Sequence, residues 1–289
     1  MAATHDDAYY VPHGTKWPIM GSIGLTVLVS SFASLLNGSE SAGIGMIIGV
    51  LIMIAMMFLW FAEVIKESHA GYYNAQVDVS FRMGMGWFIF SEVMFFAAFF
   101  GALYYARIYS VPWVGGEGAG FTTNEFLWPD YEAIWPTNGP SEVGGEFKPM
   151  AAWGLPALNT IILLTSGVTV TIAHHGILKN QRAVFNWGLF ATVLLGALFV
   201  YCQYVEYAHA YSDYNLTLES GIYGSTFFML TGFHGFHVTI GAIMLAVMWF
   251  RGINGHFNGK NHFAFEAAAW YWHFVDVVWL GLFIFVYWL

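Results

Sequence analysis

Charged residues are scarce in this sequence. Of its 289 residues, 9% are charged and 58% are hydrophobic, whereas a soluble domain carries roughly 25% charged residues. A chain of this length with so few charges could not cover its own surface in water, so the composition indicates that lipid covers it. The formal net charge of −9 argues against binding to nucleic acid, which requires basic patches.

Cysteine is nearly absent, because Cys202 is the only one in the chain. An intrachain disulfide is therefore impossible, and zinc sites built from four cysteines or from two cysteines and two histidines are excluded. The N-terminal segment 1–18 also lacks a basic region followed by a short apolar core. We therefore expect no cleaved signal peptide, and we expect the first apolar segment to remain in the mature protein.

Long apolar runs, in contrast, are abundant. A spanning helix needs about 20 mostly apolar residues, and continuous rather than alternating runs exclude a porin-like barrel. The sequence predicts an all-α, polytopic membrane protein whose single domain, 1–289, holds seven transmembrane helices. In the second span, Gly45 and Gly49 form a Gly-x-x-x-Gly face that allows close approach of another helix. The expected spans are 17–36, 44–65, 81–109, 153–178, 184–208, 223–250 and 265–289.

Basic residues set the expected orientation of these spans. With the N-terminus in the cytoplasm, seven Lys and Arg residues fall on the cytoplasmic side and two, Arg107 and Lys148, fall on the opposite side. Short cytoplasmic loops carry an excess of basic residues. The sequence therefore predicts a cytoplasmic N-terminus and a C-terminus on the other side of the membrane.

The segment 110–152, expected on the outer side, interrupts the regular pattern. It holds five of the eight prolines and three tryptophans, Trp113, Trp128 and Trp135. A structureless loop of this length is uncommon unless it has a function. Two interpretations stay open: a cap over the helix ends with its tryptophans at the membrane interface, or a docking surface for a partner subunit.

One carboxyl group lies deep in the third span. Glu92 comes about eleven residues after the start of that span, which is about 16 Å along a helix. Ionisable residues inside membrane spans are costly, so each is a functional-site hypothesis. Glu92 either holds helices together as a protonated or hydrogen-bonded group, or it handles protons, or it contacts something polar in a cleft.

Histidines also lie inside the later spans. His234 and His237 are three residues apart, so they share one helix face, and His273 precedes Asp276 by the same spacing. A di-iron bundle needs a Glu-x-x-His motif on each of two helices, and no two spans carry one. Haem between two facing histidines stays open, but we favour hydrogen bonds between packed helices and no bound metal.

Several runs resemble the cytochrome c oxidase subunit III family, and together they cover essentially the whole chain. The sequence FEAAAWYWHFVDVVW at 265–279 is similar to the family's last helix, and GIYGSTFFMLTGFHGFHVTIG at 221–241 is similar to its sixth. Further similarities lie at 158–175, at 64–68 (VIKES), and at 88–100 around Glu92.

The resemblance implies an accessory, non-catalytic subunit without redox centres in a proton-pumping oxidase that reduces oxygen to water. Haem and copper then belong to the partner subunits I and II, and cytochrome c is contacted through the complex. The implied fold sets helices one and two (about 17–65) apart from a bundle of five (about 81–289), with phospholipids in a V-shaped cleft between them. The lipid-binding positions carried over are Trp60, Lys66, Glu67 and Arg251, and Glu92 matches the family's buried carboxyl group.

The resemblance also has departures and rivals. Gly101, Tyr73 and Phe61 stand where the mitochondrial pattern often has Trp, His and Trp. The long segment after Ser110 points to a bacterial protein of the inner membrane, with a periplasmic C-terminus. A quinol oxidase subunit is the nearest alternative, although those usually lack the first two spans. A stand-alone transporter would need broken helices and inverted repeats, and a haem-binding membrane cytochrome is the third alternative.

Overall fold

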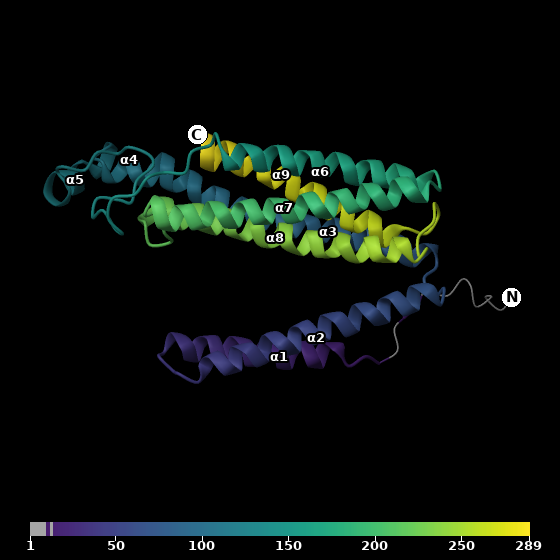
Figure 1. The fold of residues 1–289 in the computed structure, drawn as a ribbon. Coiled ribbons are helices and arrows are strands. Elements are labelled where there is room, and N and C mark those ends of the chain that lie inside the picture. Colours follow the sequence, from purple (N-terminus) through teal and green to yellow (C-terminus); the bar gives the residue numbers. More distant parts are fainter. Residues whose placement is uncertain (1–9, 12–13) are drawn as a thin grey trace. The chain divides into compact units, whose positions relative to one another are not determined.

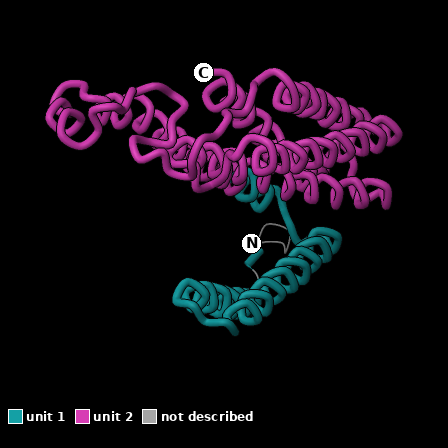
Figure 2. The backbone as a smooth tube through the Cα atoms, turned by 60° about the vertical axis from the view of Figure 1, so that its left-hand side comes forward, with its two compact units in different colours: residues 1–83 teal, residues 84–289 magenta. Residues whose placement is uncertain are grey.

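The structure is a computed structural model that describes residues 10–11 and 14–289. Every regular element among these residues is a helix. The chain divides into two compact units, residues 1–83 and residues 84–289 (Figure 2). The first unit contains two long helices and the start of a third, and the second unit contains the rest of the chain.

The first unit is a helical hairpin. α1 (Trp17–Leu36) packs along α2 (Ala42–His69), and the turn between them includes Gly38 with a φ of 82°. The two helices approach closely at Gly49, where an added Cβ would lie 2.8 Å from the backbone of Leu28. Gly45 faces the side chain of Ser31. The close approach predicted from the Gly-x-x-x-Gly spacing is confirmed, and α1 is the helix that uses it.

The second unit is a bundle of long helices (Figure 1). α3 (Ala75–Tyr105) enters it and continues through a π-helical turn, Ala106–Ser110, into the short α4 (Val111–Val114). The other long helices are α6 (Leu155–Leu178), α7 (Arg182–Asp213), α8 (Gly221–Ile253) and α9 (Phe263–Leu282), the last extended by a π-helical turn, Phe283–Trp288. α6 and α8 each pack against α7 and α9. α3 joins them through aromatic side chains such as Phe95, whose ring lies 5.0 Å from that of Phe233 on α8.

The centre of this bundle is α9. In its apolar stretch 61% of the residues are buried, against 39% or fewer in every other span. Its Trp272 is fully buried and fits because Gly196 on α7 and Gly241 on α8 have no side chain. A Cβ at these two positions would lie 2.7 and 2.9 Å from the indole. The indole Nε1 donates to Ser166 Oγ on α6 at 2.9 Å, so this one side chain fixes α9 against three neighbours.

Among the residues that the structure describes, seven helices are long and apolar enough to cross a membrane, as the sequence predicts. The third is longer than expected and runs over Ala75–Val114 instead of 81–109. It begins early because Asn74 Oδ1 accepts a hydrogen bond from the Val77 N–H at 3.0 Å, a side-chain cap that satisfies a free donor of the first turn. The sequence-based boundary was placed too late because the first turn of the helix contains polar residues.

The segment 110–152 is not a structureless loop. Besides α4 it contains a 3₁₀ turn, Gly118–Gly120, and α5 (Phe121–Leu127). It packs on the N-terminal end of α8, where the rings of Trp135 and Phe147 lie 5.7 and 5.4 Å from that of Tyr223. The C-terminus lies at the same end of the bundle (Figure 1). These contacts favour a cap over the helix ends.

Candidate functional site

A polar contact near the middle of two spans joins α3 and α8. Glu92 Oε2 lies 2.7 Å from His237 Nε2. Glu92 is near the middle of α3 and His237 is near the middle of α8, so the two side chains meet at matching depth. Their side chains are 20% and 11% exposed, which leaves the pair screened by protein but not sealed.

The second nitrogen of His237 fixes the proton arrangement of the pair. Nδ1 lies 2.6 Å from the carbonyl oxygen of Phe233, and a carbonyl oxygen only accepts, so Nδ1 carries a hydrogen and donates it. Nε2 is then either the acceptor of a protonated Glu92 or the donor of an imidazolium facing a carboxylate. Both forms contain one shared proton and have no net charge, which suits a site of low dielectric constant.

Aromatic rings surround this pair. Phe96 and Phe95 of α3 lie 5.1 and 5.9 Å from the His237 ring, centroid to centroid. Tyr271 of α9 lies parallel to the same ring at 6.3 Å. These rings shield part of the contact between Glu92 and His237.

His234 shares the helix face predicted for His237 but has another partner. It is fully buried, and its Nε2 donates to the carbonyl oxygen of Val275 on α9 at 3.2 Å. Its ring lies 5.1 Å from that of Trp279 and 5.6 Å from that of Phe199. His234 therefore ties α8 to α9, whereas His237 ties α8 to α3.

His273 and Asp276 face each other within α9. His273 Nδ1 lies 3.5 Å from Asp276 Oδ2, and Nε2 lies 3.3 Å from Thr171 Oγ1 on α6. Gly167 makes room for the carboxyl group, since a Cβ there would lie 2.5 Å from Asp276 Oδ2. This group bridges α9 and α6 close to the surface of the bundle.

Three of the positions carried over by resemblance lie on α2, in the first unit. Glu67 Oε1 accepts from the Tyr10 hydroxyl at 2.8 Å, and Oε2 accepts from the Tyr73 hydroxyl at 2.6 Å. Burial is the main cause that raises the pKa of Tyr73, and its hydrogen bond to Glu67 adds to the effect. The pKa of Tyr10 is raised mainly by its own hydrogen bond to Glu67. Lys66 is exposed, and Trp60, 44% exposed, stacks on Phe61.

Arg251 lies in the last turn of α8, in the second unit. Its guanidinium carbon is 4.7 Å from the centroid of the Phe257 ring, and Nη1 contacts the Met248 sulfur at 3.9 Å. The buried Nε makes no hydrogen bond to the described part of the chain. The side chain is thus half-buried without a carboxylate partner among the described residues.

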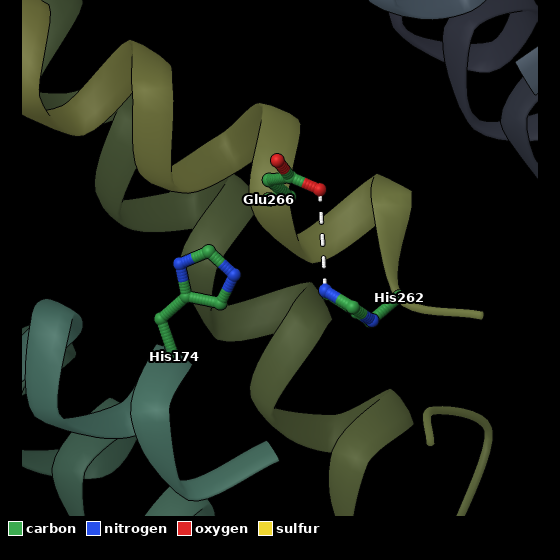
Figure 3. A group of neighbouring side chains, drawn as sticks. All are labelled: His174, His262 and Glu266. Atoms are coloured by element: carbon green, nitrogen blue, oxygen red, sulfur yellow. Dashed lines mark ion pairs between the residues drawn. The ribbon is translucent and has the colours of Figure 1, made fainter. Parts of the chain in front are cut away.

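The sequence analysis did not identify two further polar groups as sites. Glu206 of α7 is fully buried and accepts from the Tyr287 hydroxyl at 2.7 Å. His174 of α6 comes together with His262 and Glu266 at the start of α9 (Figure 3). The second group had a usable signal, because His262 and Glu266 are four residues apart and so share a helix face.

The His174 group could hold a divalent metal ion. One ligand atom from each residue lies within 4.8 Å of the others, and His262 Nε2 lies 3.9 Å from Glu266 Oε2. Two imidazoles and a carboxylate are the protein ligands of a zinc site that keeps one position open. The prediction of no bound metal rested on the histidines of the spans and not on a grouping of His174 with His262 and Glu266.

Comparison with known proteins bears on the whole chain. The family model described as cytochrome c oxidase subunit III matches residues 7–122 and 129–289. The chain belongs to the cytochrome c oxidase subunit III family. It is 39% identical to cytochrome c oxidase subunit 3 of Marchantia polymorpha over 289 residues, which are 100% of this chain and 98% of that protein. The protein of the same name from Dugong dugon is 38% identical over 282 residues, 97% of each chain.

Membership of the subunit III family confirms the resemblance drawn from the sequence motifs. The chain is a multi-pass membrane subunit of a terminal oxidase of the respiratory chain. A third relative, from Cyprinus carpio, is 39% identical over 97% of both chains. Because these relatives come from a plant and from animals, the predicted bacterial origin stays a prediction.

Proposed function

We propose that this chain is the accessory, non-catalytic subunit III of a proton-pumping cytochrome c oxidase and that it holds phospholipids beside subunit I. In this role it has no redox centre, and haem and copper lie in subunits I and II. It supports the stability of subunit I, its proton uptake and the access of oxygen. Cytochrome c is met through the assembled complex.

The main support for phospholipid binding is that Arg251 has no anionic partner among the described residues. A half-buried guanidinium normally pairs with a carboxylate or phosphate, yet its contacts within the described chain are a sulfur atom and a phenyl ring. It lies in the last turn of α8, at the depth where basic side chains reach lipid headgroups. A headgroup phosphate supplies the missing acceptor for the Arg251 donors.

The α2 positions fit a second headgroup contact. Lys66 is an exposed cation in the last turn of α2, and Trp60 presents an exposed ring about 1.7 turns earlier. Both oxygens of Glu67 already accept from tyrosines, but each retains a lone pair for an ammonium group. We propose that these three side chains and Arg251 bind phospholipid headgroups, as the family resemblance implies.

The Glu92–His237 pair supports the proposed link to proton uptake. It is a neutral unit with one shared proton at mid-span, and its charge does not change when the proton moves between the two residues. We propose that it passes a proton between its two side chains and holds α3 against α8. Within the described residues both ring nitrogens of His237, and Nε2 of His234, are hydrogen-bonded to carbonyl or carboxyl groups. Nδ1 of His234 is buried without a hydrogen-bond partner there. These contacts do not favour haem ligation between the two histidines.

The proposed orientation places the N-terminus in the cytoplasm and the C-terminus in the periplasm of a bacterial inner membrane. The seven-to-two distribution of Lys and Arg supports it. The position of the segment 110–152 and of the C-terminus at one end of the bundle agrees with this topology (Figure 1).

The proposed function is tested by removing the chain and by changing Arg251. An oxidase purified without this subunit should start at normal activity and then lose it during turnover, whereas undiminished activity over many turnovers would contradict the support of subunit I.

In native mass spectrometry, Arg251→Gln should release a bound phospholipid that wild type retains, while Arg251→Lys should retain part of it. Equal lipid content in all three forms would contradict lipid holding at Arg251.

A further inference from the structure

His273 is exposed at a depth where exposure is costly. It is the eleventh residue of α9, about 15 Å from the start of the helix, and its side chain is 46% exposed. Within residues 84–289 no other histidine, carboxylate or cationic side chain near the middle of a span is exposed to this extent. Ionisable residues inside membrane spans almost always face protein or a water-filled cavity.

The contacts of His273 within the chain are weak. The Thr171 hydroxyl already donates to the Gly167 carbonyl oxygen at 2.8 Å, so His273 Nε2 can only donate to it, at 3.3 Å. The separation from Asp276 is 3.5 Å, and Asp276 Oδ1, although buried, makes no hydrogen bond to the described chain. The group therefore has unused donors and acceptors beside an exposed surface.

The surface around His273 differs from the other exposed faces of the bundle. Thr171, an exposed threonine of α6, contacts it, and small polar residues are enriched where membrane helices pack. On the outward faces of α7 and α8 the exposed mid-span residues are large and mostly apolar. They include Leu194, Leu198, Phe236, Ile240, Ile243 and Val247.

We propose that the α6–α9 face at His273 is the docking surface for a transmembrane helix of another oxidase subunit. That helix places a hydrogen-bonding side chain against the His273–Asp276–Thr171 group and covers it from lipid. Val168, Ile172 and Val277, all exposed beside the group, pack against the same helix. The inference rests on the chain being a subunit of a larger oxidase, which its family shows, and not on lipid holding or proton support.

Site-specific photo-crosslinking in the assembled oxidase tests this directly. A benzoylphenylalanine at Val277, 67% exposed and one turn beyond His273, is compared with one at Leu194, 59% exposed on α7. Illumination should join the Val277 form to a different oxidase subunit, identified by mass spectrometry, and the Leu194 form should give lipid adducts. The proposal is overturned if Val277 gives only lipid adducts, an adduct to a second copy of this chain, or an internal adduct to α1 or α2.

Substitution of His273 tests the hydrogen bond itself. His273→Gln keeps a donor and an acceptor, whereas His273→Leu removes both and leaves a side chain that lipid tolerates. An interhelical hydrogen bond in a membrane corresponds to about a threefold change in association. After graded detergent washing, His273→Leu should retain about threefold less subunit than wild type and His273→Gln a near-normal amount. Equal retention of the two variants would overturn the contact. The crosslink from Val277 to another subunit does not depend on turnover or on retained phospholipid, so its failure can be distinguished from failure of the proposed function.

Discussion

Glu92 on α3 and His237 on α8 meet through a 2.7 Å contact although 145 residues separate them in the chain. Because the Phe233 carbonyl fixes a hydrogen on Nδ1, the contact contains a single proton that either partner can hold. The two side chains thus form one neutral, hydrogen-bonded pair. A buried carboxyl group that would be costly alone becomes acceptable in the span through this partner.

Glu92→Gln should change stability or lipid retention mildly and leave proton pumping in place. The glutamine amide donates to His237 Nε2, so the α3–α8 contact survives while the exchangeable proton is lost. We expect wild-type numbers of protons pumped per electron, measured with reconstituted vesicles, and a thermal midpoint close to that of wild type. Complete loss of pumping would contradict a supporting role for the pair.

Glu92→Leu is the informative contrast to that substitution. It leaves His237 Nε2 without a partner among the described residues, and an unsatisfied buried polar group costs about 1–3 kcal/mol. The complex should therefore unfold at a lower temperature with Glu92→Leu than with Glu92→Gln. Identical unfolding of the two variants would show that the hydrogen bond does not hold α3 against α8.

The features that depend on residues close in the sequence were predicted. The seven spans, the shared face of His234 and His237, and the approach of His273 to Asp276 all follow from helix periodicity and apolar length. The depth of Glu92 was also predicted. Its partner was not, because periodicity cannot tell which of two histidines on one face turns to α3 and which turns to α9.

Contacts between distant segments account for the remaining differences. The helical cap of 110–152 and the pairing of Glu67 with Tyr10 and Tyr73 depend on packing that no local pattern encodes. Matching depth on two spans, as for Glu92 and His237, is the one signal that could have suggested the pair beforehand.

The hydroxyl of Tyr73 should ionise only at high pH. Burial and the bond to Glu67 raise its pKa above the ordinary value, so the fold favours the neutral phenol. This contribution to stability is complete below a pH of about 10, the unfolded value, and is lost as the pH rises through the higher folded value. In a spectroscopic titration of tyrosinate, Tyr73→Phe should remove absorbance from the alkaline end of the curve. Removal of absorbance that develops at or below about pH 10 would contradict this assignment.

Gly241→Ala should destabilise the bundle because its methyl group would lie 2.9 Å from the Trp272 ring. Overpacking of a filled core costs about 1–3 kcal/mol. Gly101→Ala on α3 is the matched control, since nothing lies within 4 Å of its added Cβ and alanine favours a helix. Thermal unfolding of the purified complex should show a lower midpoint for Gly241→Ala only. Equal midpoints would mean that Trp272 shifts without cost.

Glu206 should carry a proton in the folded subunit. It is fully buried on α7, its hydrogen-bond donor is the neutral Tyr287 hydroxyl, and no cationic side chain within residues 84–289 pairs with it. An isolated buried carboxylate is far costlier than the neutral acid. The infrared spectrum of the oxidase should therefore contain a protonated-carboxyl C=O band that Glu206→Gln removes and Tyr287→Phe shifts. Because the glutamine keeps the shape and the acceptor for Tyr287, the variant should assemble normally. A spectrum unchanged by Glu206→Gln would show that the residue is ionised and that a cation outside this chain reaches it.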